Sequence, residues 1–367
     1  MKIKCNKSDL SKAINNVSHS VPVRTTSPIL EGILFEVENN KMTLTSTDTN
    51  MTIETFISVE CNEKISFVVP AKLLINIVSK LPSEEVNIEY NYNKNNIIIK
   101  SAGSKTEIIC FSADEFPKLK LEESDNYINI SKEDIKNLIR KTAFCASTDE
   151  FNAILTGVLF EIKDNNVRMV GVDPFRIAIC NNELKYDNDI SVVIPAKLII
   201  EISKIINEEN DEDMSINITD NKVILRFDNN KVTVNTLSGK FVDYNRIINN
   251  KGNIKVRVKR SDLIKSIERA SILTSIQNNN LIKINIDNDI LTINSLSEEG
   301  NIEEKLEVIK EGEDIKIGIN AKYLKDALSV IDEEEVYINF KDSLSPCIIS
   351  PLKGDKYTYL ILPIRMN

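Results

Sequence analysis

The stretch VPAKLLINIVSKL at residues 69–81 is written three times in this chain. Related stretches occupy residues 194–205 (IPAKLIIEISKI) and 319–331 (INAKYLKDALSVI), and successive copies begin 125 residues apart. In each copy apolar residues recur at helical spacing, whereas lysines mark the opposite side. The pattern therefore predicts a repeated amphipathic helix that buries one face and offers positive charge on the other.

The repeat length sets the domain organisation. A chain of 367 residues is too long for one core and suits three domains of about 120 residues each. Repeats of this length are whole domains rather than solenoid turns. We expect domains at residues 1–121, 127–248 and 253–367, with polar linkers at 118–126 and 249–253.

Each domain is predicted to be two strand–helix–three-strand units, which gives an α+β fold class. Ser8 is the expected cap of the first helix. The run at 29–37 is interpreted as a strand and recurs at 154–161, with a glycine in the same place in both copies. The six predicted helices span residues 7–20, 71–81, 131–147, 195–207, 259–275 and 320–331.

Charge is divided between the helices and the rest of the chain. The protein has a formal charge of −9, yet the six predicted helices contain sixteen Lys and Arg against seven Asp and Glu. Basic residues four apart, such as Lys136 with Arg140 and Lys265 with Arg269, lie on one helix face. A solvated face is the simpler interpretation of any single helix. Agreement among six helices favours a polyanion, with DNA phosphates the obvious candidate.

The sequence offers little for catalysis. The single histidine, His19, lies on a predicted polar helix face, and no glycine-rich phosphate loop is present. Asp48 and Asp173 stand 125 residues apart, so they occupy equivalent places in different domains and cannot form one carboxylate pair. We expect no catalytic residue, no metal site and no cofactor.

The six cysteines are scattered without a Cys-x-x-Cys pair, which is typical of small core residues in a reduced protein. The polar start of the chain and the short apolar runs predict a soluble, cytoplasmic protein without a membrane span.

The chain resembles the beta subunit of bacterial DNA polymerase III, the sliding clamp family, over its whole length. Each matching segment is short, but their order and spacing together are specific. They are Arg24–Leu30, Thr47-Asp48, Pro70–Lys72, Glu115–Pro117, Leu155–Gly157, Val172-Asp173, Arg176–Ala178, Asp243-Tyr244 and Leu362–Arg365.

The resemblance implies a head-to-tail ring dimer, with helices inside facing duplex DNA and sheets outside. Binding would be independent of sequence, and tethering would raise the local concentration of polymerase. The expected DNA-facing residues are Lys12, Arg24, Lys72, Lys80, Lys136, Arg140, Lys197, Lys204, Lys265, Arg269 and Lys322.

The resemblance also implies a pocket for short peptides of the polymerase III alpha subunit, the clamp-loader delta subunit and other proteins with a clamp-binding motif. Its mostly apolar lining suits a peptide. The equivalent positions are Leu155, Val172, Pro174, Phe175, Arg176, Ile177, Val242, Ile247, Pro346, Leu360, Leu362, Pro363, Ile364, Arg365 and Met366. The sequence departs from the family pattern at Pro174, Phe175, Val242 and Asn367, and Asn152 stands where arginine is common near the hole.

The implied dimer contact joins the last strand of the first domain to a strand of the third. Opposite charges beside an apolar patch suit such an interface. The expected residues are Leu74, Val78, Lys100 and Lys105 on one side and Ile272, Leu273, Glu298, Glu299, Glu303 and Glu304 on the other.

The sequence thus predicts a non-enzymatic DNA polymerase processivity factor. The first alternative is a triplicated scaffold that binds only proteins, its lysine stripes merely solvated. A less favoured one is a metal-dependent hydrolase built on acidic loops such as 211–213 and 333–335.

Overall fold

The computed structural model of the chain describes residues 2–117, 126–207, 212–248, 252–274 and 280–366. The predicted linkers are 118–126 and 249–253, and most of each, residues 118–125 and 249–251, lies outside the described residues. Asp211 and Asn367 lie outside them as well. Contacts divide the chain into two compact units, residues 1–133 with 201–236 and residues 134–200 with 237–367. The middle repeat therefore contributes to both units.

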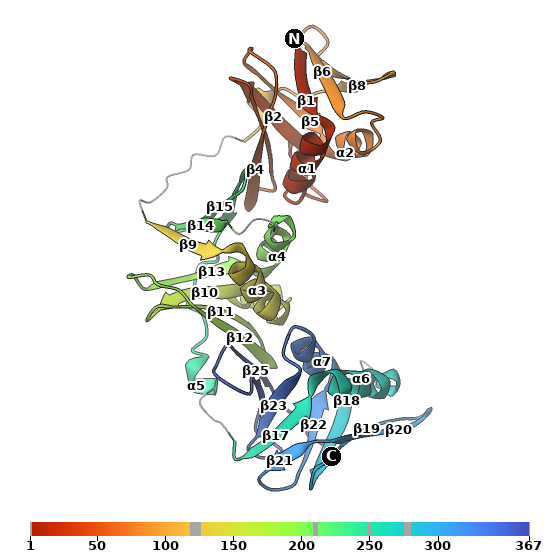
Figure 1. Cartoon of the computed structure of the whole chain (residues 1–367), viewed down its shortest axis with the longest axis vertical. Helices are drawn as coiled ribbons and strands as arrows, with labels where there is room; N and C mark the ends of the chain where they lie inside the picture. Colours follow the sequence, from red (N-terminus) through yellow and green to blue (C-terminus); the bar gives the residue numbers. More distant parts are fainter. Residues whose placement is uncertain (1, 118–125, 208–211, 249–251, 275–279, 367) are drawn as a thin grey trace. The chain divides into compact units, whose positions relative to one another are not determined.

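The first unit contains two antiparallel sheets (Figure 1). An eight-stranded sheet runs in the order β5-β2-β3-β4-β16-β15-β14-β9 and a four-stranded sheet in the order β1-β6-β7-β8. Strands of the first and second repeats pair directly, since Ile53 of β4 lies opposite Val232 of β16. The strands are β1 Lys2–Asn6, β2 Gly32–Glu38, β3 Lys41–Thr47, β4 Met51–Ser58, β5 Ile65–Pro70, β6 Glu85–Asn91, β7 Asn96–Ser101, β8 Ser104–Ile109, β9 Tyr127–Ser131, β14 Asp213–Ile218, β15 Lys222–Phe227 and β16 Asn230–Asn235.

The second unit repeats this plan. A nine-stranded sheet runs in the order β13-β10-β11-β12-β25-β24-β23-β17-β21 and a four-stranded sheet in the order β20-β19-β18-β22. Here β12 pairs with β25, placing Ile177 opposite Leu360. The strands are β10 Gly157–Lys163, β11 Asn166–Asp173, β12 Arg176–Glu183, β13 Ile190–Pro195, β17 Ile254–Lys259, β18 Leu281–Asp287, β19 Ile290–Ser297, β20 Gly300–Glu307, β21 Ile309–Glu311, β22 Ile315–Asn320, β23 Glu335–Phe340, β24 Cys347–Ser350 and β25 Tyr357–Ile361.

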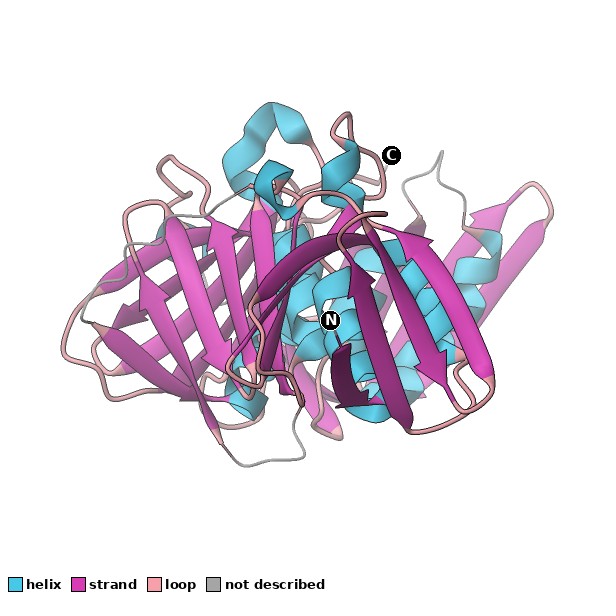
Figure 2. Ribbon diagram, turned by 90° about the horizontal axis from the view of Figure 1, so that it is seen from above, coloured by secondary structure: helices cyan, strands magenta, loops and turns pink. Residues whose placement is uncertain are grey.

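The six predicted helices are present, and each is shorter than predicted. Figure 2 shows helices, in cyan, packed beside the strands, in magenta. A four-residue helix, α5 Asn245–Ile248, was not predicted. The cap of the first helix is Asn6, whose side chain accepts a hydrogen bond from the Ser8 amide, so the prediction of Ser8 as cap is wrong. The helices are α1 Lys7–Ser18, α2 Ala71–Ser79, α3 Lys132–Thr142, α4 Ala196–Ile205, α6 Arg260–Ala270 and α7 Ala321–Ser329.

The predicted strands at 29–37 and 154–161 begin too early. Pro28–Glu31 and Glu150–Thr156 are 3-10 segments, and the strands start at Gly32 and Gly157. Both glycines lie where the neighbouring strand approaches closely, because a Cβ on Gly157 would lie 2.6 Å from Val193 Cγ1. The apolar residues before each glycine pack inward from a tight turn rather than from a strand.

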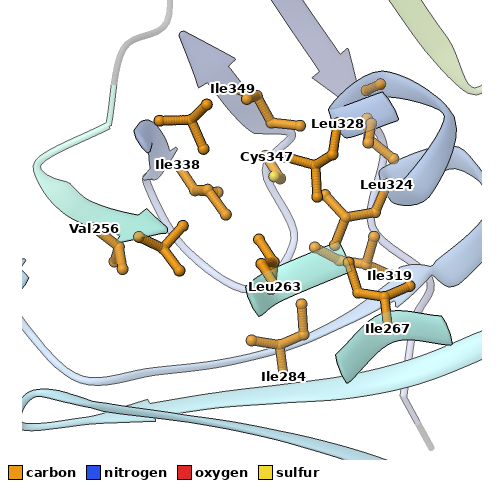
Figure 3. Close-up of a cluster of buried hydrophobic side chains, with 14 of the residues drawn as sticks. Val256, Leu263, Ile267, Ile284, Ile319, Leu324, Leu328, Ile338, Cys347 and Ile349 are labelled. Atoms are coloured by element: carbon orange, nitrogen blue, oxygen red, sulfur yellow. The ribbon is translucent and has the colours of Figure 1, made fainter. Parts of the chain in front are cut away.

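The core of the second unit is formed where α6 and α7 cover the sheet strands (Figure 3). Leu263 and Ile267 of α6 and Leu324 of α7 are fully buried, as the helical spacing of these residues requires. They pack with Val256, Ile284, Ile319, Leu328, Ile338, Cys347 and Ile349. The polar faces of these helices are consequently left for solvent or a partner.

Among the described residues, no helix combines the length and apolar character that crossing a membrane requires.

Candidate nucleic-acid and peptide interfaces

The predicted DNA-facing residues lie on or beside the helices, and all of them are exposed except Lys136, which is half-buried. Lys12, Arg24, Lys72, Lys80 and Lys204 belong to the first unit. The other six belong to the second unit, namely Lys136, Arg140, Lys197, Lys265, Arg269 and Lys322.

Lys204, Arg269 and Arg140 are held by acidic side chains of the protein itself. Lys204 Nζ lies 2.5 Å from Glu201, which also contacts His19 Nδ1 at 2.7 Å. Arg269 Nε donates to Glu304 Oε1 at 2.8 Å. That hydrogen bond holds the pKa of Glu304 below its ordinary value.

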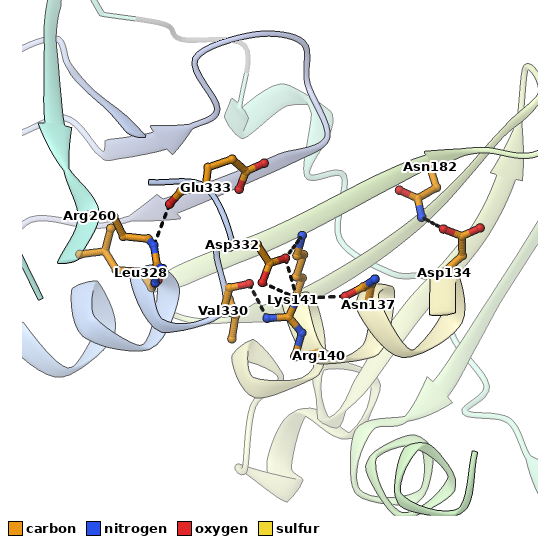
Figure 4. A network of polar contacts seen from close by, with 10 residues as sticks. All are labelled: Asp134, Asn137, Arg140, Lys141, Asn182, Arg260, Leu328, Val330, Asp332 and Glu333. Atoms are coloured by element: carbon orange, nitrogen blue, oxygen red, sulfur yellow. Dashed lines mark hydrogen bonds and ion pairs between the residues drawn. The ribbon is translucent and has the colours of Figure 1, made fainter. Parts of the chain in front are cut away.

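Arg140 is the third, and it joins α3 to the turn that follows α7 (Figure 4). Its guanidinium donates to both carboxylate oxygens of Asp332, at 3.0 and 2.7 Å, and to the Val330 carbonyl at 2.9 Å. Lys141 Nζ lies 2.9 Å from the same carboxylate. Burial alone would raise the pKa of Asp332, but hydrogen bonds from Arg140 and Lys141 hold it below its ordinary value.

Lys72, Lys197 and Lys322 differ from these paired residues. Each is the second residue of its helix, α2, α4 or α7, and each is exposed. No acidic side chain among the described residues lies within ion-pair distance of any of the three. A cation near a helix N-terminus is disfavoured by the helix dipole. A contribution to folding stability therefore does not explain why an unpaired lysine recurs at this position in three helices.

The predicted peptide-site residues all belong to the second unit. Val172, Ile177 and Leu360 are buried in one apolar cluster, and Leu155 packs against it. Tyr244 joins the same cluster from the segment before α5, and burial raises the pKa of its hydroxyl to about 12. Four further apolar members are more than a third exposed, namely Phe175, Val242, Ile247 and Leu362.

The C-terminal segment is fixed by main-chain hydrogen bonds. The Leu362 amide donates to the Phe175 carbonyl at 2.8 Å, and the Ile364 amide donates to the Gly318 carbonyl at 2.8 Å. A Cβ on Gly318 would lie 3.0 Å from Met366 Cγ. Contacts therefore join the tail to both the β11–β12 turn and β22. Pro174 lies in this turn and is exposed, and Arg365 of the tail is exposed as well. Pro363 of the tail and Pro346, which directly precedes β24, are half-buried.

Arg176 is enclosed by protein groups, and only 10% of its side chain is exposed. Its guanidinium donates to Asp173 at 2.9 Å, to Asp326 at 2.8 Å and to the Phe144 carbonyl at 3.2 Å. The Tyr323 ring centroid lies 4.4 Å from its Cζ. All its donor nitrogens are thus engaged within the second unit.

The predicted dimer residues differ in their exposure and in their ion pairs. Leu74 and Val78 are almost fully buried in the core of their own domain, so the prediction that they lie at a subunit contact is wrong. Lys100 lies 2.7 Å from Glu89, and Glu304 is bound to Arg269. Lys105, Ile272, Glu298, Glu299 and Glu303 are exposed, and Leu273 is half-buried.

Three exposed apolar residues on α2, β8 and β19 were not predicted as part of the dimer contact. Leu73 of α2 is 48% exposed, Ile109 of the edge strand β8 is 76% exposed, and Leu296 of β19, beside the edge strand β20, is 70% exposed. Leu73 and Leu74 are neighbours of the same type, so only the packing of α2 distinguishes the face that each occupies. The two sheet edges β8 and β20 carry main-chain groups that no described strand pairs.

The acidic residues do not gather into a metal site in the part of the chain that the structure describes. Asp48 accepts hydrogen bonds from the Asn50 and Met51 amides, and Asp173 accepts them from the Phe175 and Arg176 amides. Both aspartates therefore stabilise the same tight turn in successive domains, which accounts for their spacing without catalysis.

Three tandem domains of one repeated α+β plan, with two long helices in each among the described residues, define the class of DNA clamps. Models of the DNA polymerase III beta subunit match the chain throughout, with the N-terminal domain at residues 1–120, the central domain at 129–243 and the C-terminal domain at 245–365. The chain belongs to the DNA polymerase III beta subunit family.

Individual relatives agree with this assignment. The beta sliding clamp of Staphylococcus epidermidis is 33% identical over 363 residues, covering 96% of both chains. A crystal structure of a putative DNA polymerase III beta subunit from Eubacterium rectale matches with a TM-score of 0.94 at 36% identity, and the Bacillus subtilis sliding clamp matches with a TM-score of 0.96 at 31% identity. Both structures cover 100% of each chain.

Members of this family are the non-catalytic processivity subunit of DNA polymerase III. The prediction of a processivity factor is confirmed, and the scaffold and hydrolase alternatives are not favoured.

Proposed function

We propose that two copies of this chain join head to tail in a ring that encircles duplex DNA without sequence specificity. The ring tethers the polymerase III alpha subunit, the clamp-loader delta subunit and other proteins with a clamp-binding motif. It has domains at 1–121, 127–248 and 253–367, and it works in the cytoplasm, where the replicating DNA is.

The repeated unpaired lysine carries the DNA part of the proposal. Lys72, Lys197 and Lys322 recur at one helix position in a chain whose net charge is −9. Phosphates of a duplex are the partner that such a cation set attracts, in a manner that salt weakens. Lys12, Arg24, Lys80, Lys136 and Lys265 add to this surface, as do Arg140, Lys204 and Arg269, which also contact carboxylates.

The apolar rim carries the peptide part. Phe175, Val242, Ile247 and Leu362 are more than a third exposed, and Val172, Ile177 and Leu360 are buried in one apolar cluster. We expect the four exposed residues to form a rim over this buried floor, an arrangement that suits apolar side chains of a short peptide. Pro174, Phe175 and Val242 depart from the family pattern at this rim, so peptide preference should differ from that of other clamps. Asn152 replaces a cation, so it should contribute less to DNA contact.

The dimer contact joins edge strand β8 of one copy to edge strand β20 of the other. Leu73 and Ile109 would meet Ile272, Leu273 and Leu296, with Lys105 opposite Glu298, Glu299 and Glu303. Such a heterologous contact closes when it is used twice, and the apolar residues should dominate because surface ion pairs contribute under about 1 kcal/mol each.

Retention on DNA circles tests the proposal. After loading, the protein should stay on a closed or nicked circle and leave once a restriction enzyme makes the DNA linear. Equal retention before and after cutting would contradict encirclement and favour ordinary binding.

A further inference from the structure

Arg176 lies in the set of predicted peptide-site residues, yet its guanidinium faces the protein interior. Its hydrogen bonds go to Asp173, Asp326 and the Phe144 carbonyl, and 10% of its side chain is exposed. A side chain with its donors so engaged is poorly placed to bind a peptide directly. The role of Arg176 is better understood from the groups that its guanidinium holds in place.

The groups around Arg176 come from two elements. Asp173 belongs to β11, at the start of the β11–β12 turn, whereas Asp326 and Tyr323 belong to α7. Tyr323 and Asp326 are three positions apart and therefore share a helix face. The carboxylate of Asp326 and the ring of Tyr323 both contact the guanidinium.

The turn held by Arg176 presents the exposed apolar ring of the predicted peptide site. The Asp173 carboxylate that binds Arg176 Nε also accepts hydrogen bonds from the Phe175 and Arg176 amides, at 2.8 and 2.9 Å. The Phe175 ring stacks on Tyr323 with centroids 6.2 Å apart. The Phe175 carbonyl accepts from the Leu362 amide. One chain of contacts thus runs from Asp326 through Arg176 and Asp173 to Phe175 and the C-terminal tail.

The equivalent helix position makes a similar contact in the first unit. Glu201 of α4 lies 125 residues before Asp326, and its carboxylate contacts His19 at 2.7 Å. In both cases the acid binds a cationic or protonatable side chain from a preceding repeat. An acid at this helix position therefore makes a contact between repeats in both units. In the second unit the contact is made to Arg176, which is part of the predicted peptide-site turn.

We propose that Asp326 is a positioning residue for the peptide site: through Arg176 it fixes the Asp173–Arg176 turn, and so pre-orders Phe175 and the main chain that holds Leu362. This inference rests on the proposed function, because it concerns the same peptide site. Pre-ordering raises affinity since a site that is competent only part of the time binds more weakly by that fraction.

The test measures the affinity of the full-length protein for a fluorescein-labelled peptide copied from the clamp-binding segment of the polymerase III alpha subunit. Asp326→Ala should weaken binding about tenfold, as for a turn that is competent about a tenth of the time. Asp326→Asn, which keeps the shape but removes the charge, should show a smaller decrease in affinity.

Asp332→Ala is the matched control. Asp332 lies six residues after Asp326 and also makes ion pairs with residues of the second repeat, but its partners are Arg140 and Lys141 of α3. Among the described residues, neither of these two makes a hydrogen bond or ion pair to a predicted peptide-site side chain. Peptide affinity should stay within about twofold of wild type. An equal decrease in Asp332→Ala would mean that general loosening explains the effect, and the inference would be overturned.

Two further readouts separate positioning from mere stability. If Asp326 acts through Arg176, the double variant Asp326→Ala/Arg176→Ala should bind no more weakly than Arg176→Ala alone. Hydrogen exchange of the Phe175, Arg176 and Leu362 amides should accelerate in Asp326→Ala and not in Asp332→Ala. Additive effects on affinity, or unchanged exchange at these amides, would contradict the proposal.

Failure of the inference and failure of the proposed function give different results. If the wild-type protein does not bind the peptide, the proposed peptide site is wrong. If wild type binds and Asp326→Ala binds equally well, the site stands and the positioning role of Asp326 is wrong.

Discussion

At Gly157 the chain has room for a hydrogen and little more. A Cβ there would lie 2.6 Å from Val193 Cγ1, 2.8 Å from Leu237 Cδ1 and 2.9 Å from the Ile194 carbonyl oxygen. Its φ of −103° is accessible to any residue, so packing rather than backbone conformation requires glycine. The matching glycine in the first repeat, Gly32, meets Val68 in the same way.

We expect Gly157→Ala to lower the free energy of unfolding by about 1–3 kcal/mol, because β10 and β13 must separate to admit the methyl group. Thermal unfolding checks this. Gly103→Ala is the control, since no atom lies within 4 Å of a Cβ at that position. Equal melting temperatures for Gly157→Ala and wild type would contradict the packing argument.

Single lysines can be ranked by whether the protein already neutralises them. Replacing Lys72 or Lys322 by alanine should reduce the salt dependence of binding to a short linear duplex, by about 0.9 in log–log slope for each phosphate that is no longer neutralised. Equilibrium titrations at several salt concentrations measure the slope. Lys163→Ala, an exposed lysine on β10 outside the helices, should leave it unchanged. A change as large in Lys163→Ala would show that total charge, not the helix position, determines binding.

At the scale of elements, helical periodicity predicts all six long helices because each has one apolar face that a sheet covers. It cannot resolve the turn before Gly157, since apolar residues in a 3-10 segment and in a strand look alike over four positions. Helical periodicity also cannot decide which of the adjacent Leu73 and Leu74 is buried. The partners of Arg140 and Arg269 are equally out of reach, because Asp332 and Glu304 are brought to them only by tertiary folding.

The contact between α3 and the turn after α7 should depend on pH. The pKa of Asp332 is lower in the folded protein than its ordinary value, so its ion pairs stabilise the fold at neutral pH. This contribution disappears as the pH falls through the folded-state pKa. Asp332→Asn should therefore lower the free energy of unfolding at pH 7. The difference in that free energy between pH 7 and pH 3 should be smaller in Asp332→Asn than in wild type.

Urea unfolding at both pH values tests this, with Asp355→Asn, an exposed acid whose side chain makes no ion pair among the described residues, as the control. The argument fails if acidification lowers the stability of wild type and Asp332→Asn by the same amount.

At the scale of the whole molecule, repetition in the sequence explains why the lysines at one helix position are easy to identify, whereas the residues of a subunit contact are not. The proposed DNA contact uses a charge pattern that occurs three times in the sequence. The proposed contact between copies uses only the first and third repeats, so repetition gives no guide to it. The sequence misplaces Leu74 and Val78 because α2 is apolar on both sides of its buried face, at Leu73 and Ile77 as well.

Leu73 and Leu74 provide the sharpest test of the subunit contact. Leu74 is fully buried, so Leu74→Ala should cost about 2–5 kcal/mol of folding stability. Leu73 is half exposed, so Leu73→Ala combined with Ile109→Ala should leave folding intact and weaken the dimer. Sedimentation at a series of protein concentrations would then show monomer at concentrations where wild type is dimeric. If the Leu73/Ile109 variant stays dimeric at those concentrations, β8 and α2 do not form the contact, and the ring must close through another surface.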